Sequence, residues 1–185
     1  MNESDFTTKI KNWLSPRLAP TYKCETGRSL LYKVIVDTDG TLKPANPMVP
    51  SRGQFAFKTD VLISHNELPL VVVELKYGGF STHDVLTYSA KAVRHKEIYP
   101  YLRYGFAVGG QDGIDLKFFT HNVGFDFAIA VPREGDDLQD LTALVGRQLE
   151  AAEQLVRVLD QGRRGSKPKE YETIVNLRWG DDEHS

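Results

Sequence analysis

Apolar side chains recur at helical spacing near the start of the chain. The positions that share this face are Phe6, Ile10, Trp13 and Leu14. Residues three or four apart lie on one side of a helix, so the pattern predicts an amphipathic helix. Ser4 and Asp5 are residue types that cap a helix start, and Pro16 and Pro20 are expected to end the helix.

Short apolar runs rich in β-branched residues follow and predict strands at 30–36, 55–64 and 70–77. Residues 37–53 contain several prolines and glycines, which predicts a long loop. Residues 65–69 separate the last two strands and predict a hairpin connection. The final strand is almost continuously apolar, which indicates that both of its faces are buried.

The second half of the chain alternates between helical and strand patterns. A helix capped by Ser81 or Thr82 is predicted to run to about Tyr99. The remaining predicted elements are strands at 106–108, 116–119 and 125–131 and a helix at 138–159. This order indicates an α/β fold with a central mixed β-sheet flanked by helices. We expect a single domain over 1–161 and a polar tail over 162–185.

Composition narrows the classes of function. Among the 185 residues, 23 Lys and Arg oppose 25 Asp and Glu, a net charge of −2, so any nucleic-acid site must be a local patch. A single cysteine, Cys24, excludes an intrachain disulfide. The longest apolar run, 68–73, is too short to span a bilayer, and the first residues are polar. We therefore expect a soluble cytoplasmic protein with no membrane partner.

The predicted hairpin brings three ionisable residues together. If its turn centres on Glu67, residue i pairs with residue 134 − i, and Asp60 lies opposite Glu74. Directly opposed residues project to the same face. Lys76 shares that face because side chains alternate along a strand. The intervening apolar residues, such as Val61 and Val73, are expected to point to the other face, into the core.

This triplet suits phosphodiester hydrolysis. Two neighbouring carboxylates repel each other, and a divalent cation relieves the repulsion. Mg²⁺ takes oxygen ligands, usually one or two carboxylates with water and substrate phosphate. A lysine beside the metal orients the attacking water or helps to deprotonate it. The bland alternative is a buried salt bridge between Lys76 and Asp60 or Glu74, but a glutamate inside so apolar a strand favours the functional interpretation.

The Asp60…Glu74-Leu75-Lys76 motif, in this order of elements, resembles that of the PD-(D/E)XK nuclease superfamily, which has the restriction-endonuclease-like fold. The resemblance covers roughly 2–110. It implies that Asp60 and Glu74 bind the catalytic metal and that Lys76 assists the water. The motif departs at Thr59, where the family often has Pro. Many members add a glutamate from the first helical region, for which Glu25 is the candidate here and Glu3 a weaker one.

The resemblance implies a Mg²⁺-dependent DNA endonuclease, with Mn²⁺ as a possible substitute ion. A type II restriction-type enzyme is the expected case, and a homodimer would supply the two active sites that duplex cleavage requires. The apolar stripe of the 138–159 helix is a candidate interface, although packing on its own sheet explains the stripe equally well. Alternatives are a nuclease module of a larger restriction or repair assembly, and a non-catalytic nucleic-acid-binding protein that keeps the fold.

The helix after the motif carries candidate DNA contacts. Tyr88, Lys91 and His95 form one polar stripe, flanked by Arg94 and Lys96. In the superfamily the corresponding helix backs the active site, so Lys91 is the natural candidate to face substrate. Arg94 and Lys96 are further candidates, each of which equally fits a solvated helix face.

Two segments outside the motif are also candidates for contact with DNA. One is the long loop at 37–53, which precedes the metal-binding hairpin. The other is a basic cluster in the tail, which equally suits a solvated segment. The cluster consists of Arg163, Arg164, Lys167 and Lys169.

Overall fold

The computed structural model describes residues 1–47, 49–50, 53, 55–132 and 138–179. The helices are α1 (Glu3–Leu18), α2 (Thr82–Ile98), α3 (Leu116–His121) and α4 (Gln139–Gly162). The strands are β1 (Lys23–Thr26), β2 (Ser29–Leu31), β3 (Ile35–Val36), β4 (Leu42–Lys43), β5 (Ala56–Lys58), β6 (Val61–His65), β7 (Leu68–Tyr77), β8 (Arg103–Gly109) and β9 (Phe127–Val131).

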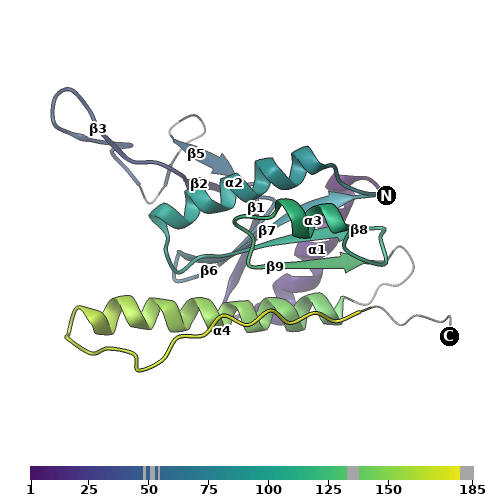
Figure 1. The fold of residues 1–185 in the computed structure, drawn as a ribbon. Coiled ribbons are helices and arrows are strands. Elements are labelled where there is room, and N and C mark those ends of the chain that lie inside the picture. The colour runs from purple at the N-terminus through teal and green to yellow at the C-terminus, as the bar shows by residue number, and fades with distance from the viewer. Residues whose placement is uncertain (48, 51–52, 54, 133–137, 180–185) are drawn as a thin grey trace.

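Five of the strands form one sheet in the order β1-β6-β7-β8-β9. The β1–β6 and β6–β7 pairs are antiparallel, while β7–β8 and β8–β9 are parallel. The sheet is therefore mixed, and helices flank it (Figure 1). This confirms the predicted α/β fold with a central mixed β-sheet.

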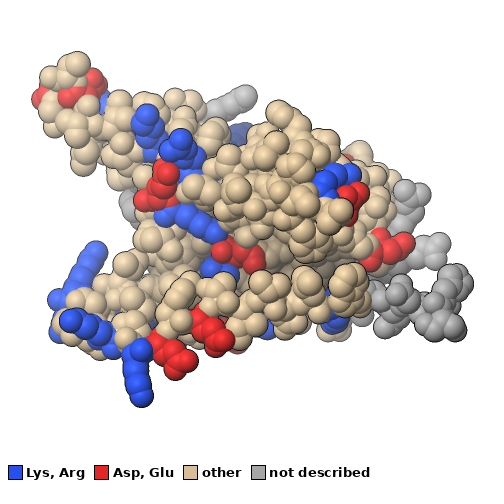
Figure 2. All heavy atoms as spheres, in the orientation of Figure 1, with Lys and Arg blue, Asp and Glu red and all other residues tan. Residues whose placement is uncertain are grey.

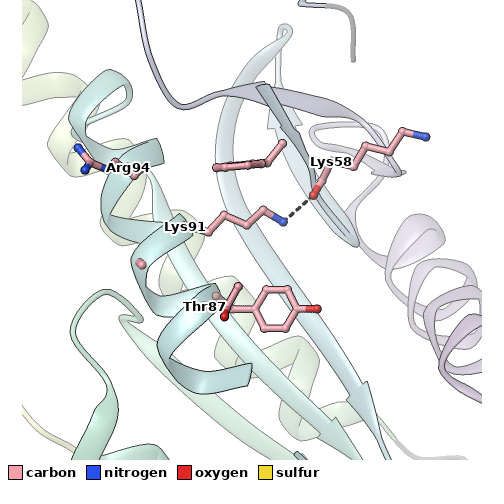
Figure 3. A pocket seen from close by; sticks show the side chains of 7 residues that line it. Lys58, Thr87, Lys91 and Arg94 are labelled. Carbon is pink, nitrogen blue, oxygen red and sulfur yellow. Dashed lines mark hydrogen bonds between the residues drawn. The ribbon is translucent and has the colours of Figure 1, made fainter. Parts of the chain in front are cut away.

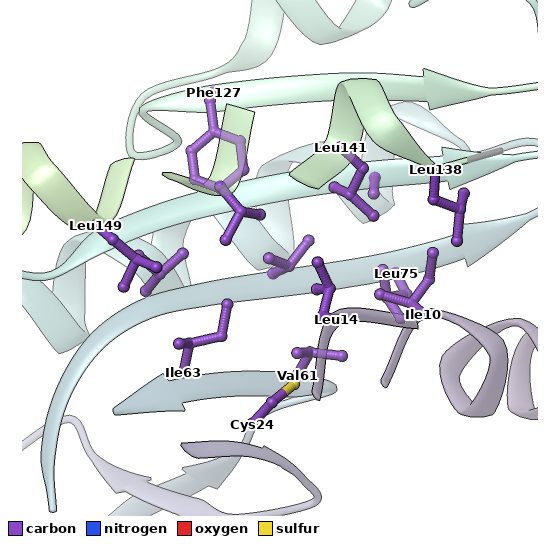
Figure 4. Close-up of a cluster of buried hydrophobic side chains, with 14 of the residues drawn as sticks. Ile10, Leu14, Cys24, Val61, Ile63, Leu75, Phe127, Leu138, Leu141 and Leu149 are labelled. Carbon is purple, nitrogen blue, oxygen red and sulfur yellow. The ribbon is translucent and has the colours of Figure 1, made fainter. Parts of the chain in front are cut away.

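The alternation of side chains along the strands builds a core on each face of the sheet. Val71 and Val73 pack with α1 and α4, whereas the intervening Val72 packs with α2 and α3. Figure 4 shows the first of these cores, where Leu14 and Leu141 converge on the sheet from different helices. Burial on both faces explains why the β7 sequence is almost continuously apolar.

The register of the central hairpin follows the predicted rule over its first three pairs. Val61 lies opposite Val73 and Ile63 lies opposite Val71, so each pair sums to 134. A bulge after Ile63 shifts the last two pairs by one residue. The connection is two residues long, and Asn66 and Glu67 both have positive φ, as a tight hairpin turn of this length requires.

Helix α2 begins where the sequence predicts. The Ser81 hydroxyl accepts the backbone N–H of Asp84, and the Asp84 carboxylate accepts the Ser81 N–H. Val85, Ser89 and Ala92 form the buried face of α2 together with His95, a member of the predicted polar stripe, while Leu86 and Val93 are exposed. The polar stripe of α2 faces the sheet because it has polar partners there.

Two other local predictions are wrong. Residues 116–119 belong to α3 rather than to a strand, because the Asp115 side chain accepts the N–H of Lys117 and begins a short helix. Pro16 lies inside α1 and does not end it. The proline costs only one backbone hydrogen bond in the last turn, and the helix ends at Leu18, shortly before Pro20.

Two of the predicted strands are divided. The 30–36 segment contributes to β2 and β3, which pair with β5 and β4 in two small sheets. The β3–β4 hairpin projects from the body of the molecule (Figure 1) and lies within what was expected to be a strand and a loop. The 55–64 segment breaks at Thr59 and Asp60, between β5 and β6. Part of the 37–53 loop, residues 48, 51 and 52, lies outside the described residues.

The predicted 138–159 helix is confirmed as α4, and its apolar stripe packs on its own sheet through residues that include Leu141, Val145 and Leu149. Beyond α4 the chain turns back and runs along this helix (Figure 1). An ion pair of 2.6 Å between Arg178 and Asp140 fixes the returning segment to the start of α4.

Within the described part of the chain, no helix combines the length and apolar character needed to cross a bilayer.

Candidate active site

The candidate site lies where β6 begins and β7 nears its end. One step beyond the Val61–Val73 pair, Asp60 and Glu74 adjoin across the hairpin. The Asp60 Oδ2 accepts the backbone N–H of Leu75 at 2.8 Å, which fixes this carboxylate beside β7. The structure therefore brings together the two carboxylates that the sequence predicted to meet.

Glu74 is a charged residue in the interior, with only 1% of its surface exposed. Its Oε1 receives two short hydrogen bonds of 2.6 Å, one from the Lys91 ammonium and one from the Tyr104 hydroxyl. Burial raises the pKa of Glu74 to about 7, and the charge of Asp60 adds to the rise, while Lys91 and Tyr104 oppose it. A buried carboxylate of this kind is typical of a functional site.

Lys91 reaches from α2 across to the sheet. Its ammonium donates to Glu74 and, also at 2.6 Å, to the backbone carbonyl of Lys58 on β5 (Figure 3). The side chain is 12% exposed. The cation therefore bridges the buried carboxylate and the strand that precedes Asp60.

Lys76 lies on the same strand but makes different ion pairs. Its ammonium is 3.2 Å from Glu3 Oε2 on α1 and 3.6 Å from Asp84 Oδ1 on α2, and it lies over the ring of Tyr88. Burial lowers the pKa of Lys76, but its hydrogen bond with Tyr88 and its pairing with Glu3 outweigh burial and raise the pKa. The predicted alternative, a salt bridge from Lys76 to Asp60 or Glu74, is not the arrangement found.

These side chains form one continuous network, which we call the charged cluster. Its members are Glu3, Asp60, Glu74, Lys76, Asp84, Tyr88, Lys91 and Tyr104. With all groups in their ordinary ionised forms, four carboxylates and two ammonium groups give −4 + 2 = −2. Such an excess of negative charge beside a buried carboxylate is suited to a divalent cation.

Asp60 and Glu74 are the adjoining carboxylates of the cluster that could bind a metal ion, and they would supply only part of its ligand shell. No group of three or more His, Cys, Asp or Glu that would enclose a metal occurs in the part of the chain that the structure describes. Mg²⁺ often uses only one or two carboxylates and completes its shell with water and phosphate. The Lys91 ammonium already shows that the Glu74 carboxylate attracts a cation.

The structure does not bring Glu25 into the charged cluster. Its carboxylate pairs with Lys23 at 3.0 Å and with Arg28 at 2.8 Å on and beside β1. Burial raises the pKa of Glu25, but these two partners outweigh it and lower the pKa. Glu3, the weaker candidate in the sequence, is the glutamate from the first helix that reaches the motif.

The three candidate DNA contacts on α2 differ in their surroundings. Arg94 is exposed and lies 3.3 Å from Glu97 in the next turn. Lys96 is engaged within the protein, because its ammonium lies 2.7 Å from both Asp126 and the carbonyl of Gly124. Of the three, Arg94 presents its charge to solvent, and Lys91 is committed to Glu74.

A shallow groove of about 380 Å³ opens beside Lys91, between α2 and β5. Phe57, Tyr88 and the cationic residues Lys58, Lys91 and Arg94 line it (Figure 3). The groove meets the charged cluster at Tyr88 and Lys91, and its lining is mostly apolar, with the charged ends of Lys58 and Arg94 pointing away from Lys91 (Figure 3).

Two members of the charged cluster were not found by sequence reasoning. Tyr104 lies on β8 opposite Val72, and nothing in its local sequence distinguishes it from a core tyrosine. Asp84 was accessible in principle, because its position three residues after Ser81 marks a capping box at the end of the motif strand.

Surface charge elsewhere is mixed. Figure 2 shows Lys and Arg side chains gathered around the turn that follows α4, where the basic cluster of the tail lies. Arg164 in this cluster is exposed and lies 3.7 Å from Asp160.

No protein-family model and no curated protein matches this chain.

Proposed function

We propose that the protein is a Mg²⁺-dependent DNA endonuclease with a restriction-endonuclease-like core. The observation that carries the proposal is the meeting of Asp60 and Glu74 at one end of the central hairpin, with Lys76 two residues farther along β7. A buried carboxylate next to a second one, with its Lys91 partner lining a surface groove, is an arrangement that stability alone does not call for.

The proposed metal ligands are Glu74 Oε2 and Asp60 Oδ1, the oxygens that the hydrogen bonds to Tyr104, Lys91 and Leu75 do not use. When bound, Mg²⁺ supplies stabilisation of the charge that develops on the phosphate, and Mn²⁺ is expected to substitute for it. Tyr104 orients Glu74 by holding Oε1, and the Leu75 amide orients Asp60 in the same way.

Lys76 is proposed to orient the attacking water and to offset phosphate charge. Because Glu3 and Tyr88 raise its pKa, the side chain remains an ammonium at neutral pH and does not act as the base. Glu3 and Asp84 hold this ammonium from two different helices. In this proposal Glu3, rather than Glu25, is the glutamate that the first helix adds to the site.

The proposed substrate is duplex DNA, cut by a homodimer in the manner of a type II restriction enzyme. Two-fold symmetry would place one charged cluster on each strand. The apolar stripe of α4 is largely used within the protomer, but Leu159 at its end remains 45% exposed. This residue is the part of the stripe that is open to a second copy.

The alternatives are a nuclease module of a larger assembly and a non-catalytic binding protein. Replacing Lys76 by Ala separates an enzyme from a binding protein. We expect Lys76→Ala to retain DNA affinity in fluorescence anisotropy and to lose at least about a hundredfold in cleavage rate. The matched control is Lys117→Ala, whose ammonium pairs with Asp115 away from the cluster.

Equal cleavage by Lys76→Ala and by the control would contradict the proposed role of Lys76. DNA binding by the wild type without any cleavage in Mg²⁺ would favour a binding protein or a module that needs a partner chain.

A further inference from the structure

We propose that Lys91 is a displaceable internal cation, which holds the Glu74 carboxylate until a divalent metal ion binds and then turns into the adjacent groove to bind a substrate phosphate. This inference rests on the metal site of the proposed function. It adds a link between metal binding and substrate binding that the motif itself does not contain.

The position of the Lys91 ammonium opposes metal binding at Glu74. At 2.6 Å from Glu74 Oε1, Lys91 lies against the carboxylate that is proposed to hold the metal. A divalent ion on the same carboxylate would meet this positive charge at close range, and like charges repel strongly where water is largely excluded. Lys91 in its present position therefore opposes metal binding.

The burial of Glu74 explains why the Lys91 ammonium lies beside it. Without a metal, an ionised carboxylate as deeply buried as Glu74 needs a counter-charge. Lys91 supplies it, and its second bond to the Lys58 carbonyl keeps it in place. When a metal ion neutralises Glu74 instead, the ion pair with Glu74 no longer stabilises Lys91 in this position.

The groove beside α2 offers the Lys91 ammonium a second position. Lys91 lines the groove as well as the cluster, so its long side chain has open space on its other side (Figure 3). Arg94, one turn farther along α2, and Lys58 on β5 line the same groove. The charged ends of Lys58 and Arg94 point away from Lys91 (Figure 3), so a phosphate in the groove would meet the displaced Lys91 ammonium, which is a suitable partner for a nucleic-acid backbone.

These steps couple two binding events through one side chain. Metal binding favours the state in which Lys91 has left Glu74, and phosphate binding in the groove favours the same state. By linkage each ligand must then increase the affinity for the other. The protein would bind Mg²⁺ weakly when free and more tightly when nucleic acid is present.

The test is Mg²⁺ binding by isothermal titration calorimetry on the full chain, at alkaline pH so that proton competition at Glu74 is small. Lys91→Met removes the charge while keeping the length of the side chain. We expect it to bind Mg²⁺ about tenfold more tightly than the wild type, since the competing cation is gone. Lys91→Arg keeps a competing charge and should remain near the wild type, as should Lys117→Met, which removes an ammonium that pairs with Asp115 outside the charged cluster.

A second titration adds saturating thymidine 5′-monophosphate as the phosphate probe. The nucleotide should tighten Mg²⁺ binding by the wild type several-fold and leave Lys91→Met unchanged. If Lys91→Met does not fold, Lys91→Gln, which retains a hydrogen-bond donor without the charge, takes its place.

Unchanged or weaker Mg²⁺ binding by the neutral Lys91 variant would overturn this inference. The variant Glu74→Gln distinguishes that failure from a failure of the proposed function. If Glu74→Gln abolishes Mg²⁺ binding while Lys91→Met has no effect, the metal site stands and the displaceable cation does not. If Glu74→Gln binds Mg²⁺ as the wild type does, the proposed metal site is itself wrong.

Discussion

At the scale of single residues, the site depends on how one glutamate is kept inside the protein. Glu74 occupies a strand position that faces α2, between Val73 and Leu75, which point to the opposite core. Two donors converge on one of its oxygens, and Asp60 approaches from the neighbouring strand. The two donors therefore hold the Glu74 carboxylate in place, but the nearby negative charge of Asp60 offsets part of the positive charge of Lys91.

The hydroxyl of Tyr104 should contribute measurably to this arrangement. Tyr104→Phe removes one of the two donors to Glu74 while keeping the ring in the core. We expect a loss of about 1 kcal/mol in the free energy of unfolding, measured by urea denaturation without metal. Tyr101→Phe, at a half-buried tyrosine outside the cluster, is the control, and an equal loss in both variants would refute a specific role for the hydroxyl.

The pKa of Glu74 predicts how stability depends on pH. Because burial raises this pKa from 4.5 to about 7, the folded protein binds a proton that the unfolded chain has released across this interval. The stability of the metal-free protein should therefore fall as the pH rises from about 4.5 to about 7. Glu74→Gln should lose this component of the pH dependence, and an unchanged profile would count against the raised pKa.

At the scale of secondary structure, α2 is the element that completes the site. It presents Asp84, Tyr88 and Lys91 toward the sheet at successive turns, and its capped start places Asp84 at the end of the motif strand. Its other contacts include α3, the loop that follows α3, and β2, where the His95 ring lies 3.1 Å from the Leu30 carbonyl. The position of Lys91 therefore depends on close packing along the whole helix.

The loop at Gly124 provides a test of that packing. A Cβ at Gly124 would clash with the backbone carbonyl of Ser89 on α2, whereas one at Gly113 would meet open space. Gly124→Ala should lower the free energy of unfolding by about 1–3 kcal/mol, as overpacking commonly does. Thermal unfolding of Gly124→Ala beside Gly113→Ala measures this, and equal melting temperatures would show that the loop yields.

At this scale, part of the candidate site could be predicted from the sequence and part could not. The predicted register, with pairs that sum to 134, holds at the Val61–Val73 end of the hairpin and so brings Asp60 beside Glu74. The two-residue turn alone gives pairs that sum to 133, and the unpredicted bulge after Ile63 makes up the difference of one residue. The partners of Glu74 were not predictable, because Tyr104 comes from a parallel neighbour strand distant in sequence. Glu25 was misplaced for a different reason, since β1 directs it to Lys23 and Arg28, its neighbours in the sequence.

At the scale of the whole molecule, the charged cluster lies where three layers meet. Lys76 is held by the first turn of α1 from one layer and by the first turn of α2 from the other. The fold thus ties the site to both helical layers, and the β3–β4 hairpin projects separately from the body (Figure 1).

The projecting hairpin is a candidate DNA contact. Among the strands that the structure describes, these two pair only with each other, and Val36 and Leu42 are both largely exposed. Replacing 35–43 by a short glycine linker should therefore leave the melting temperature nearly unchanged and weaken DNA binding in fluorescence anisotropy. Unchanged affinity and an unchanged cleavage pattern would exclude the hairpin from substrate recognition.

The central claim is that Glu74 and Asp60 support metal-dependent cleavage of DNA. The most direct measurement is digestion of a mixed-sequence plasmid with Mg²⁺ or with EDTA, by the wild type, by Glu74→Ala and by Glu97→Ala, an exposed glutamate of α2. We predict cleavage by the wild type and by Glu97→Ala in Mg²⁺ only, and none by Glu74→Ala. Cleavage that persists in EDTA or in Glu74→Ala, or its absence from the wild type, would show that these carboxylates do not support metal-dependent cleavage.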